Sequence, residues 1–178
     1  MQIKDYFGEM VADHYDESAP EMFDPESIEP CVSLLEEIAG TGSALELGIG
    51  TGRIAIPLSE RGISVYGIDL SSAMINRLRQ KKRGRDIPVT MGNFATTKIE
   101  GSFSLVYLVF NTIMNLTTQA AQVACFHNAA SHLSAGGSFV VEVMVPDLQR
   151  LPFGQTIRPS EIKPTKWGFM IRVNHKER

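Results

Sequence analysis

A strand-like stretch, Ala44–Leu47, runs directly into a turn in which every second residue is glycine, and a helical stretch follows to about Glu60. The turn reads Glu46-Leu47-Gly48-Ile49-Gly50-Thr51-Gly52-Arg53. Glycines allow the sharp turn from strand to helix and let a ligand approach the backbone without a Cβ in the way. A second strand, Ile63–Ile68, is followed by Asp69, whose carboxylate can accept hydrogen bonds from both hydroxyls of a ribose. The combination predicts a strand–turn–helix unit that binds a nucleoside.

The rest of the chain continues to alternate between apolar strands and amphipathic helices. The further predicted strands are Ile87–Met91, Phe103–Phe110 and Ser138–Val145, and the further helices are 71–82 and Thr118–Leu133. The apolar run at 103–110 is typical of an interior parallel strand that is covered on both faces. The apolar residues that align as the inward face of the last helix are Val123, Phe126, Ala130 and Leu133. The order of elements predicts an α/β, Rossmann-like fold: a mostly parallel sheet with helices on both faces.

The first forty residues are acidic and differ from the rest, so residues 1–40 are interpreted as an N-terminal helical cap segment. A weak helix is expected over Ile3–Ala12. A second helix is predicted to begin at Asp24-Pro25, where an N-cap is followed by proline, and to end at Gly40. Residues 41–146 form the nucleoside-binding core, and prolines make much of residues 147–178 turn-like.

The composition is that of an ordinary globular protein and argues against several classes. The 178 residues are 43% hydrophobic and 21% charged, unlike a disordered chain. A net charge of −3 without a long Lys/Arg stripe argues against nucleic-acid binding. No apolar stretch is long enough to span a bilayer, and Met1–Met10 is unlike a signal peptide. Cys31 and Cys125 lie far apart, as in a reducing compartment, so a cytoplasmic protein without a membrane partner is expected.

Two further clusters carry structural interpretations. His127 and His132 are five residues apart on one helix and therefore do not share a face, so no metal site is predicted. The basic residues near the end of helix 71–82 are interpreted as a solvated face that the helix dipole favours; they are Arg77, Arg79, Lys81, Lys82 and Arg83.

These motifs together resemble the class I S-adenosylmethionine-dependent methyltransferases of the small-molecule type. The matching segments are the glycine turn 46–53, Tyr66–Met74, Gly92–Ala95 after the third strand, and Leu133–Gly137 before the fifth. The spacing E-x-G-x-G-x-G differs from the G-x-G-x-x-G of dinucleotide sites. Glu46 would also suit a cationic ligand and repel a pyrophosphate, which agrees with a sulfonium cofactor.

The resemblance implies a site for S-adenosyl-L-methionine at the ends of the strands. The implied cofactor-binding residues are Glu46, Gly48, Gly50, Gly52, Arg53, Asp69, Leu70, Met74, Asn93, Phe94 and Phe110. Asp69 would hold the ribose, and Asn93 would accept from the adenine amino group through its side-chain oxygen. The weaker candidates, for the substrate, are Tyr15 and Asn111. Ordinary core packing equally explains Phe94 and Phe110, and a surface loop explains Tyr15.

The implied function is methyl transfer to a nitrogen or oxygen of a small molecule, dependent mainly on positioning, with no catalytic base assigned. The family sheet normally adds two strands after the fifth. Residues 147–178 resemble instead the beginning of a substrate-binding insert, with short strands expected at Gln155–Ile157 and Trp167–Val173, so the chain is interpreted as incomplete at its C-terminus. Strand 138–145 would then be an open edge through which the chain self-associates. The alternative is a catalytically incomplete cofactor-binding or interaction module.

Overall fold

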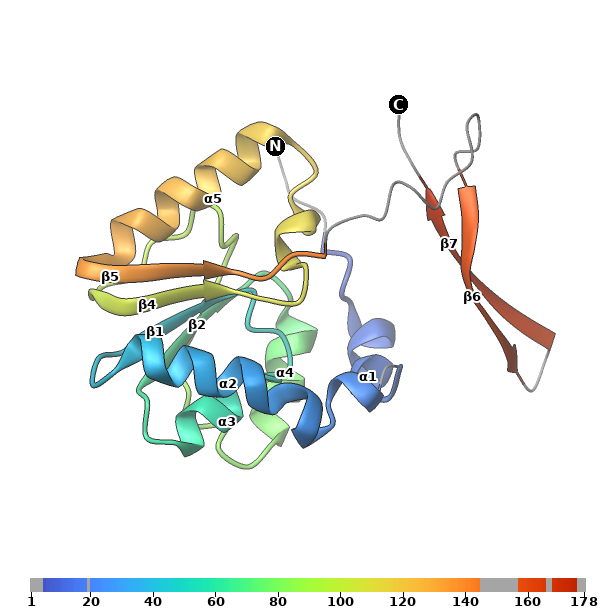
Figure 1. The fold of residues 1–178 in the computed structure, drawn as a ribbon, viewed down its shortest axis with the longest axis horizontal. Helices are drawn as coiled ribbons and strands as arrows, with labels where there is room; N and C mark the ends of the chain where they lie inside the picture. Colours follow the sequence, from blue (N-terminus) through green and yellow to red (C-terminus); the bar gives the residue numbers. More distant parts are fainter. Residues whose placement is uncertain (1–4, 19, 145–156, 166–167, 176–178) are drawn as a thin grey trace. The chain divides into compact units, whose positions relative to one another are not determined.

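The computed structural model describes residues 5–18, 20–144, 157–165 and 168–175 (Figure 1). Two compact units divide the chain, Met1–Val143 and Met144–Arg178. The first contains a five-stranded, all-parallel sheet in the order β3-β2-β1-β4-β5. Its strands are β1 (Ala44–Leu47), β2 (Val65–Asp69), β3 (Val89–Met91), β4 (Phe103–Leu108) and β5 (Leu133–Val141). The predicted α/β, Rossmann-like fold is therefore confirmed.

Helices cover both faces of this sheet, as Figure 1 shows. The helices are α1 (Glu9–Ser18), α2 (Pro25–Ala39), α3 (Ala55–Glu60), α4 (Ser72–Gln80) and α5 (Gln119–His132), with the short 3₁₀ turns η1 (Pro20–Met22) and η2 (Thr112–Asn115). On one face, α2, α3 and α4 bury Leu35, Leu58 and Leu78 against the sheet. On the other, α5 buries Cys125 and Ala129. Successive residues of a strand point to opposite faces, so both sides of the interior strands are apolar.

The predicted boundaries of α2 are confirmed. Asp24 caps the helix by accepting a hydrogen bond from the Glu26 N–H at 3.2 Å, and Gly40 ends it at a φ of 57°. The weak helix predicted over Ile3–Ala12 is wrong in position, because α1 begins at Glu9. The first turn of α1 forms on Gly8, whose carbonyl accepts from Val11 and Ala12 at 3.0 Å. Packing of Ala12 against α4 then selects this register over the weak local preference.

The inward face predicted for α5 is wrong. Val123 and Phe126 are 49% and 52% exposed, whereas Asn128 and His132 are buried. The Asn128 amide donates to the carbonyls of Phe94 and Thr97 at 2.8 and 2.9 Å, and His132 Nε2 accepts from the Ile99 N–H at 3.1 Å. The bonds satisfy the Asn128 amide nitrogen and the His132 ring nitrogen, although Asn128 Oδ1 is buried without a partner. The helix is therefore turned so that these two residues, and not its most apolar stripe, face inward.

The start of β5 and the strands of the second unit also differ from the sequence-based predictions. Gly136-Gly137 does not precede the fifth strand but lies within β5, where the register against β4 shifts and a Cβ on Gly137 would lie 2.9 Å from the Phe103 carbonyl. In the second unit, β6 (Ile157–Thr165) pairs antiparallel with β7 (Gly168–His175). The turn-like interpretation of Arg158-Pro159 and Lys163-Pro164 is wrong, since both lie in β6, with a register shift beside Pro159. Gln155, Thr156 and Trp167 lie outside the described residues.

Candidate functional site

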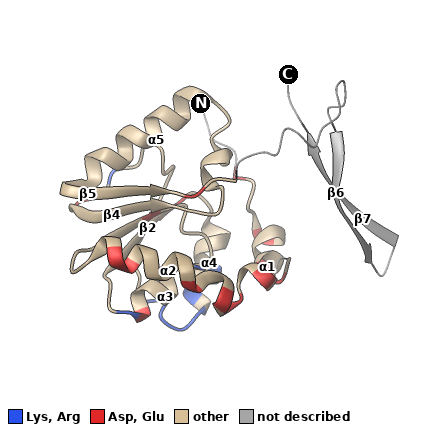
Figure 2. Ribbon diagram, in the orientation of Figure 1, with Lys and Arg blue, Asp and Glu red and all other residues tan. Residues whose placement is uncertain are grey.

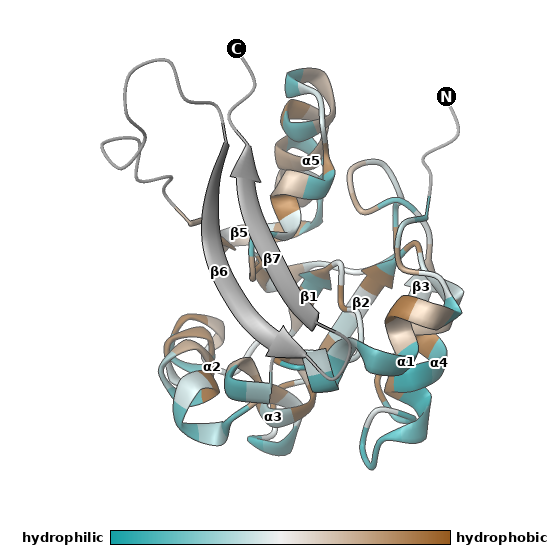
Figure 3. Ribbon diagram, turned by 90° about the vertical axis from the view of Figure 1, so that its right-hand side faces the viewer, coloured by the Kyte–Doolittle hydropathy of each residue, from teal (hydrophilic) through white to brown (hydrophobic). Residues whose placement is uncertain are grey.

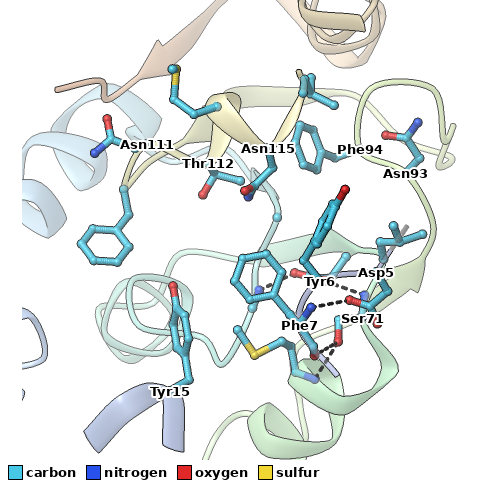
Figure 4. A pocket seen from close by; sticks show the side chains of 18 residues that line it. Asp5, Tyr6, Phe7, Tyr15, Ser71, Asn93, Phe94, Asn111, Thr112 and Asn115 are labelled. Carbon is cyan, nitrogen blue, oxygen red and sulfur yellow. Dashed lines mark hydrogen bonds between the residues drawn. The ribbon is translucent and has the colours of Figure 1, made fainter. Parts of the chain in front are cut away.

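The glycine turn after β1 opens onto a cavity of about 350 Å³ at the carboxyl ends of the strands (Figure 4). Gly50 has a φ of 55°, and a Cβ built on it would meet no atom closer than the Met74 Cε at 3.9 Å. The space in front of Gly50 is therefore the cavity itself. Gly52 differs, because a Cβ there would lie 2.4 Å from Leu78 Cδ1. Gly52 lets α4 pack against the turn and does not line the cavity.

Asp69, at the end of β2, joins the glycine turn to α4. Its side chain is 9% exposed, and Oδ2 accepts from the Gly50 N–H at 2.7 Å while Oδ1 accepts from the Ser71 N–H at 2.9 Å. Burial raises the pKa of this carboxyl, although the hydrogen bonds from Ser71 and Gly50 act in the opposite direction. Each oxygen keeps a second lone pair, so the carboxylate can accept from two ligand hydroxyls as well.

The structure brings most of the predicted site residues together around this cavity. The predicted residues that line it are Tyr15, Gly48, Gly50, Asp69, Leu70, Met74, Asn93, Phe94, Phe110 and Asn111. Asn93 Oδ1, the atom predicted to accept from the adenine amino group, already accepts from the Ala95 N–H at 2.9 Å. The same oxygen therefore also stabilises the turn after β3. Phe94 both lines the cavity and packs in the core, and the two interpretations of it therefore coexist.

Glu46 and Arg53 lie beside the main cavity instead, where they line a smaller one of about 40 Å³. The two cavities share Tyr15, Gly48, Gly50, Phe110 and Thr112. Arg53 donates to the Met22 carbonyl at 3.1 Å and lies 4.4 Å from the centre of the Phe110 ring. The small cavity thus offers one acidic and one basic side chain next to the glycine turn.

The loop after β4 is strained where it borders both cavities. Phe110 and Asn111 have φ values of 61° and 58°, in the left-handed region that non-glycine residues rarely adopt. The Glu142 carboxylate holds this conformation by accepting from the Phe110 N–H at 2.9 Å. Such strain costs on the order of 1–3 kcal/mol per residue and is concentrated at functional sites.

The N-terminal segment forms a wall of the cavity that sequence reasoning missed. The unpredicted lining residues are Asp5, Tyr6, Phe7, Ser71, Thr112, Met114, Asn115 and Leu116. Ser71 caps α4 by accepting from the Met74 N–H at 3.3 Å, and its hydroxyl also donates to the Phe7 carbonyl at 2.6 Å. No motif marks residues 5–7, because the tertiary fold alone carries them to the strand ends.

The segment is held by basic residues that the sequence suggested were merely solvated. Arg77 of α4 donates to the carbonyls of Ala12 and Asp13 in α1, which lies beside α4 (Figure 3). Lys81 Nζ lies 2.5 Å from Asp16 Oδ2 and donates to the Thr51 carbonyl at 2.8 Å. The Thr51 hydroxyl in turn donates to Asp16 at 2.6 Å. These bonds tie α1 to the glycine turn, so the solvated-face interpretation is wrong for Arg77 and Lys81. It is also wrong for Arg79, which donates to the carbonyls of Gly84 and Ile87 at 2.6 Å.

The described part of the chain contains neither a candidate metal site nor a candidate membrane-spanning helix. No group of three or more His, Cys, Asp or Glu residues there could hold a metal ion. Within the same residues, no helix is long and apolar enough to cross a membrane.

Comparison with known proteins places this site in a family. A family model described as a methyltransferase domain matches residues 44–137, which is more than half of the 178 residues. The cypemycin N-terminal methyltransferase of Streptomyces sp. is 28% identical over 139 residues, which cover 74% of this chain and 57% of that protein. The structure of the CcbJ methyltransferase from Streptomyces caelestis is 34% identical with a TM-score of 0.77, over 89% of this chain and 65% of that one.

A third structure, the glycopeptide N-methyltransferase MtfA complexed with S-adenosyl-L-methionine, has a TM-score of 0.65 at 18% identity, covering 82% of this chain and 68% of that one, and shows the shared fold. The chain spans less than two thirds of the length of the cypemycin N-terminal methyltransferase and of the CcbJ methyltransferase. The family match, the strand order and the glycine turn with Asp69 agree, and the chain belongs to the class I S-adenosylmethionine-dependent methyltransferases.

Proposed function

We propose that this chain binds S-adenosyl-L-methionine and transfers its methyl group to a nitrogen of a small-molecule acceptor. The observation that carries the proposal is the cavity in front of Gly50, with the Asp69 carboxylate beside it. Leu70, Met74 and Phe94 give this cavity an apolar wall that suits an adenine ring. The residues present therefore fit an adenosine whose ribose hydroxyls donate to Asp69.

The small cavity fits the other end of the same cofactor. An amino-acid group carries an ammonium and a carboxylate, and the space is lined by one acid, Glu46, for the ammonium and one base, Arg53, for the carboxylate. Tyr15, which borders both cavities, keeps its proton near neutral pH because burial raises its pKa. It can therefore contribute a hydrogen bond there without adding charge.

The bound cofactor supplies an electrophilic methyl group on a sulfonium. The chain's part is to hold the acceptor in line with it, and the lining of the cavity favours nitrogen over oxygen acceptors. The described residues that line the main cavity include no Lys, Arg or His, and their only acids are Asp5 and Asp69. A neutral amine already carries the attacking lone pair, whereas a hydroxyl or phenol needs a base to remove its proton. A carboxylate acceptor would lack a counter-charge in this space.

The test is methyl transfer from isotopically labelled S-adenosyl-L-methionine to matched panels of small amines, phenols and carboxylic acids, read by mass spectrometry. We expect products from amines only, at a rate that increases with pH as the amine loses its proton. Products from phenols alone would overturn the choice of nitrogen. The alternative function, a cofactor-binding module without turnover, would show S-adenosylhomocysteine binding by titration calorimetry and no product from any panel.

We further propose that the chain self-associates through the outer edge of β5, which is an edge strand of the sheet. No described strand pairs with this edge. Beside it lies α5, which carries no Lys, Arg, Asp or Glu (Figure 2), and Phe126 of α5 packs edge-to-face on Phe139 of β5 with ring centres 5.2 Å apart. An open strand edge next to exposed apolar side chains favours pairing with another copy, at about 25 cal/mol per Å² of apolar surface buried.

We expect the chain to sediment as a concentration-dependent mixture of monomer and larger species. Phe126→Lys should shift the mixture toward monomer, because it places a charge beside the edge. Met91→Lys is the matched control, since Met91 is 65% exposed on β3 at the opposite edge of the sheet. Equal sedimentation of all three proteins as monomers at every concentration would contradict this expectation.

A further inference from the structure

Glu46 is a buried acid at the border of the small cavity. It is 4% exposed and lies on the face of β1 that α2 and α3 cover. The hydroxyl of Tyr107, on β4, donates to Glu46 Oε2 at 2.9 Å. Burial raises the pKa of this carboxyl from 4.5 to about 8, outweighing the opposite effects of Tyr107 and Arg53. A carboxyl in this position has room for one small cationic partner, in the cavity of about 40 Å³.

Three titratable groups around Glu46, two tyrosines and a cysteine, keep their protons near neutral pH. Tyr107 on β4 and Cys31 on α2 both have raised pKa values, to about 11 for Cys31, so both remain neutral. Tyr15 on α1 also keeps its proton. The remaining charged groups that act on this cluster are Arg53 before α3, Asp69 at the end of β2, Asp16 on α1, which acts on Tyr15, and Glu142 after β5, which acts on Cys31. Of the two carboxyls with raised pKa values, Glu46 lines the small cavity and Asp69 does not, so Glu46 is the one that can exchange a proton when a cation enters that cavity.

We propose that Glu46 is protonated in the ligand-free protein and gives up its proton to solvent as it pairs with the α-ammonium group of the cofactor, so that cofactor binding releases a proton. This inference rests on the proposed function, because it assumes that the small cavity takes the amino-acid end of S-adenosyl-L-methionine. The step forms an ion pair between the Glu46 carboxylate and the ammonium, and the proton leaves to buffer. Tyr107 is a positioning residue that holds the carboxyl toward the cavity.

The sign of the linkage follows from the two states of Glu46. The ligand favours the ionised carboxylate, so ionising Glu46 in advance, by raising the pH, strengthens binding. Between about pH 6 and pH 7 the affinity for S-adenosylhomocysteine should therefore rise, approaching tenfold per pH unit, with almost one proton released per ligand bound. The ligand's ammonium stays protonated over this range, so it adds no opposing change.

The experiment is titration calorimetry of the whole chain with S-adenosylhomocysteine near pH 7, in buffers of different ionisation enthalpy. The slope of the observed enthalpy against the buffer's ionisation enthalpy counts the protons released. We expect close to one proton for the native chain and none for Glu46→Gln, which keeps the shape but cannot ionise. Tyr107→Phe, which removes a donor from the carboxylate, should keep the proton release and weaken binding.

The pKa of Asp69 is also raised, so Asp69 is a second possible source of the released proton. A matched ligand distinguishes it from Glu46. 5′-Methylthioadenosine keeps the adenosine and lacks the amino-acid end, so its binding should release no proton. Equal release with this ligand would assign the proton to Asp69 and overturn the proposal. Tight binding of S-adenosylhomocysteine without proton release would also overturn it while leaving the proposed function intact. An absence of any binding would instead refute the proposed function.

Unfolding of the ligand-free chain gives an independent check if Glu46→Gln binds poorly. The pKa of Glu46 is higher in the folded than in the unfolded chain, so its contribution to stability is complete below about pH 4.5 and is lost as the pH rises toward 8. The melting temperature of the native chain should fall between pH 6 and pH 8 by more than that of Glu46→Gln. Parallel curves for the two proteins would contradict a raised pKa at this position.

Discussion

Gly50→Val is expected to weaken S-adenosylhomocysteine binding by on the order of 100-fold or more, because the branched side chain would occupy the space into which the ligand must fit. The Cβ direction at Gly50 is open to the cavity, and the nearest atom, Met74 Cε, is 3.9 Å away. A Cβ at this position therefore clashes with no protein atom, although its φ of 55° strains any residue other than glycine, and the side chain extends into the space that the ligand needs. Titration calorimetry at a temperature where the variant is fully folded measures the effect.

The control for Gly50→Val must carry the same backbone strain without touching the cavity. Gly62 offers this, because its φ is 92° and no atom lies within 4 Å of a Cβ built on it. It also lies in the turn before β2, away from the carboxyl ends of the strands. Gly62→Val should lose stability to a comparable extent and bind S-adenosylhomocysteine normally. Normal binding by Gly50→Val would mean that the ligand lies elsewhere.

Asp69→Ala is expected to cost about 2–4 kcal/mol of cofactor affinity, since it removes a charged acceptor from two ribose hydroxyls. It should also lower the stability of the fold by about 1–3 kcal/mol, because the N–H groups of Gly50 and Ser71 lose their acceptor. The sequence alone predicts a single role for the Asp69 carboxylate, that of binding the ribose of the ligand. The structure adds the second role, as the link between the glycine turn and α4.

The two roles of Asp69 separate in one comparison. Asp69→Asn keeps one acceptor oxygen and most of the shape, so it should recover part of the stability, while its affinity stays below that of the native chain because the charge is lost. Thermal unfolding without ligand gives the stabilities, and calorimetry well below both transitions gives the affinities. If Asp69→Ala unfolds earlier but binds S-adenosylhomocysteine as tightly as the native chain, the carboxylate is structural and does not hold the ribose.

The part of the site that lies within one continuous strand–turn–helix–strand unit can be predicted from the order of the residues. The glycines between Gly48 and Gly52 and the acid at Asp69 are separated by few residues, and the parallel pairing of β1 with β2 brings the ends of both strands to the same edge. Local spacing therefore predicts that they meet. The same holds for the Asp24 cap of α2 and for the apolar interior strand β4, which depend on neighbouring residues alone.

The residues that complete the cavity and the rotation of α5 depend on long-range packing, which local sequence patterns do not predict. Asp5, Tyr6 and Phe7 reach the site because Arg77 and Ser71 of a distant helix hold their segment. Asn128 and His132 are buried in place of Phe126 because the Asn128 amide nitrogen and His132 Nε2 find partners on the loop after β3. In both cases a side chain's position depends on hydrogen bonds to residues far away in sequence. Hydrophobic periodicity carries no information about those bonds. It therefore predicts where helices occur but not how a helix is rotated or which residues line the cavity.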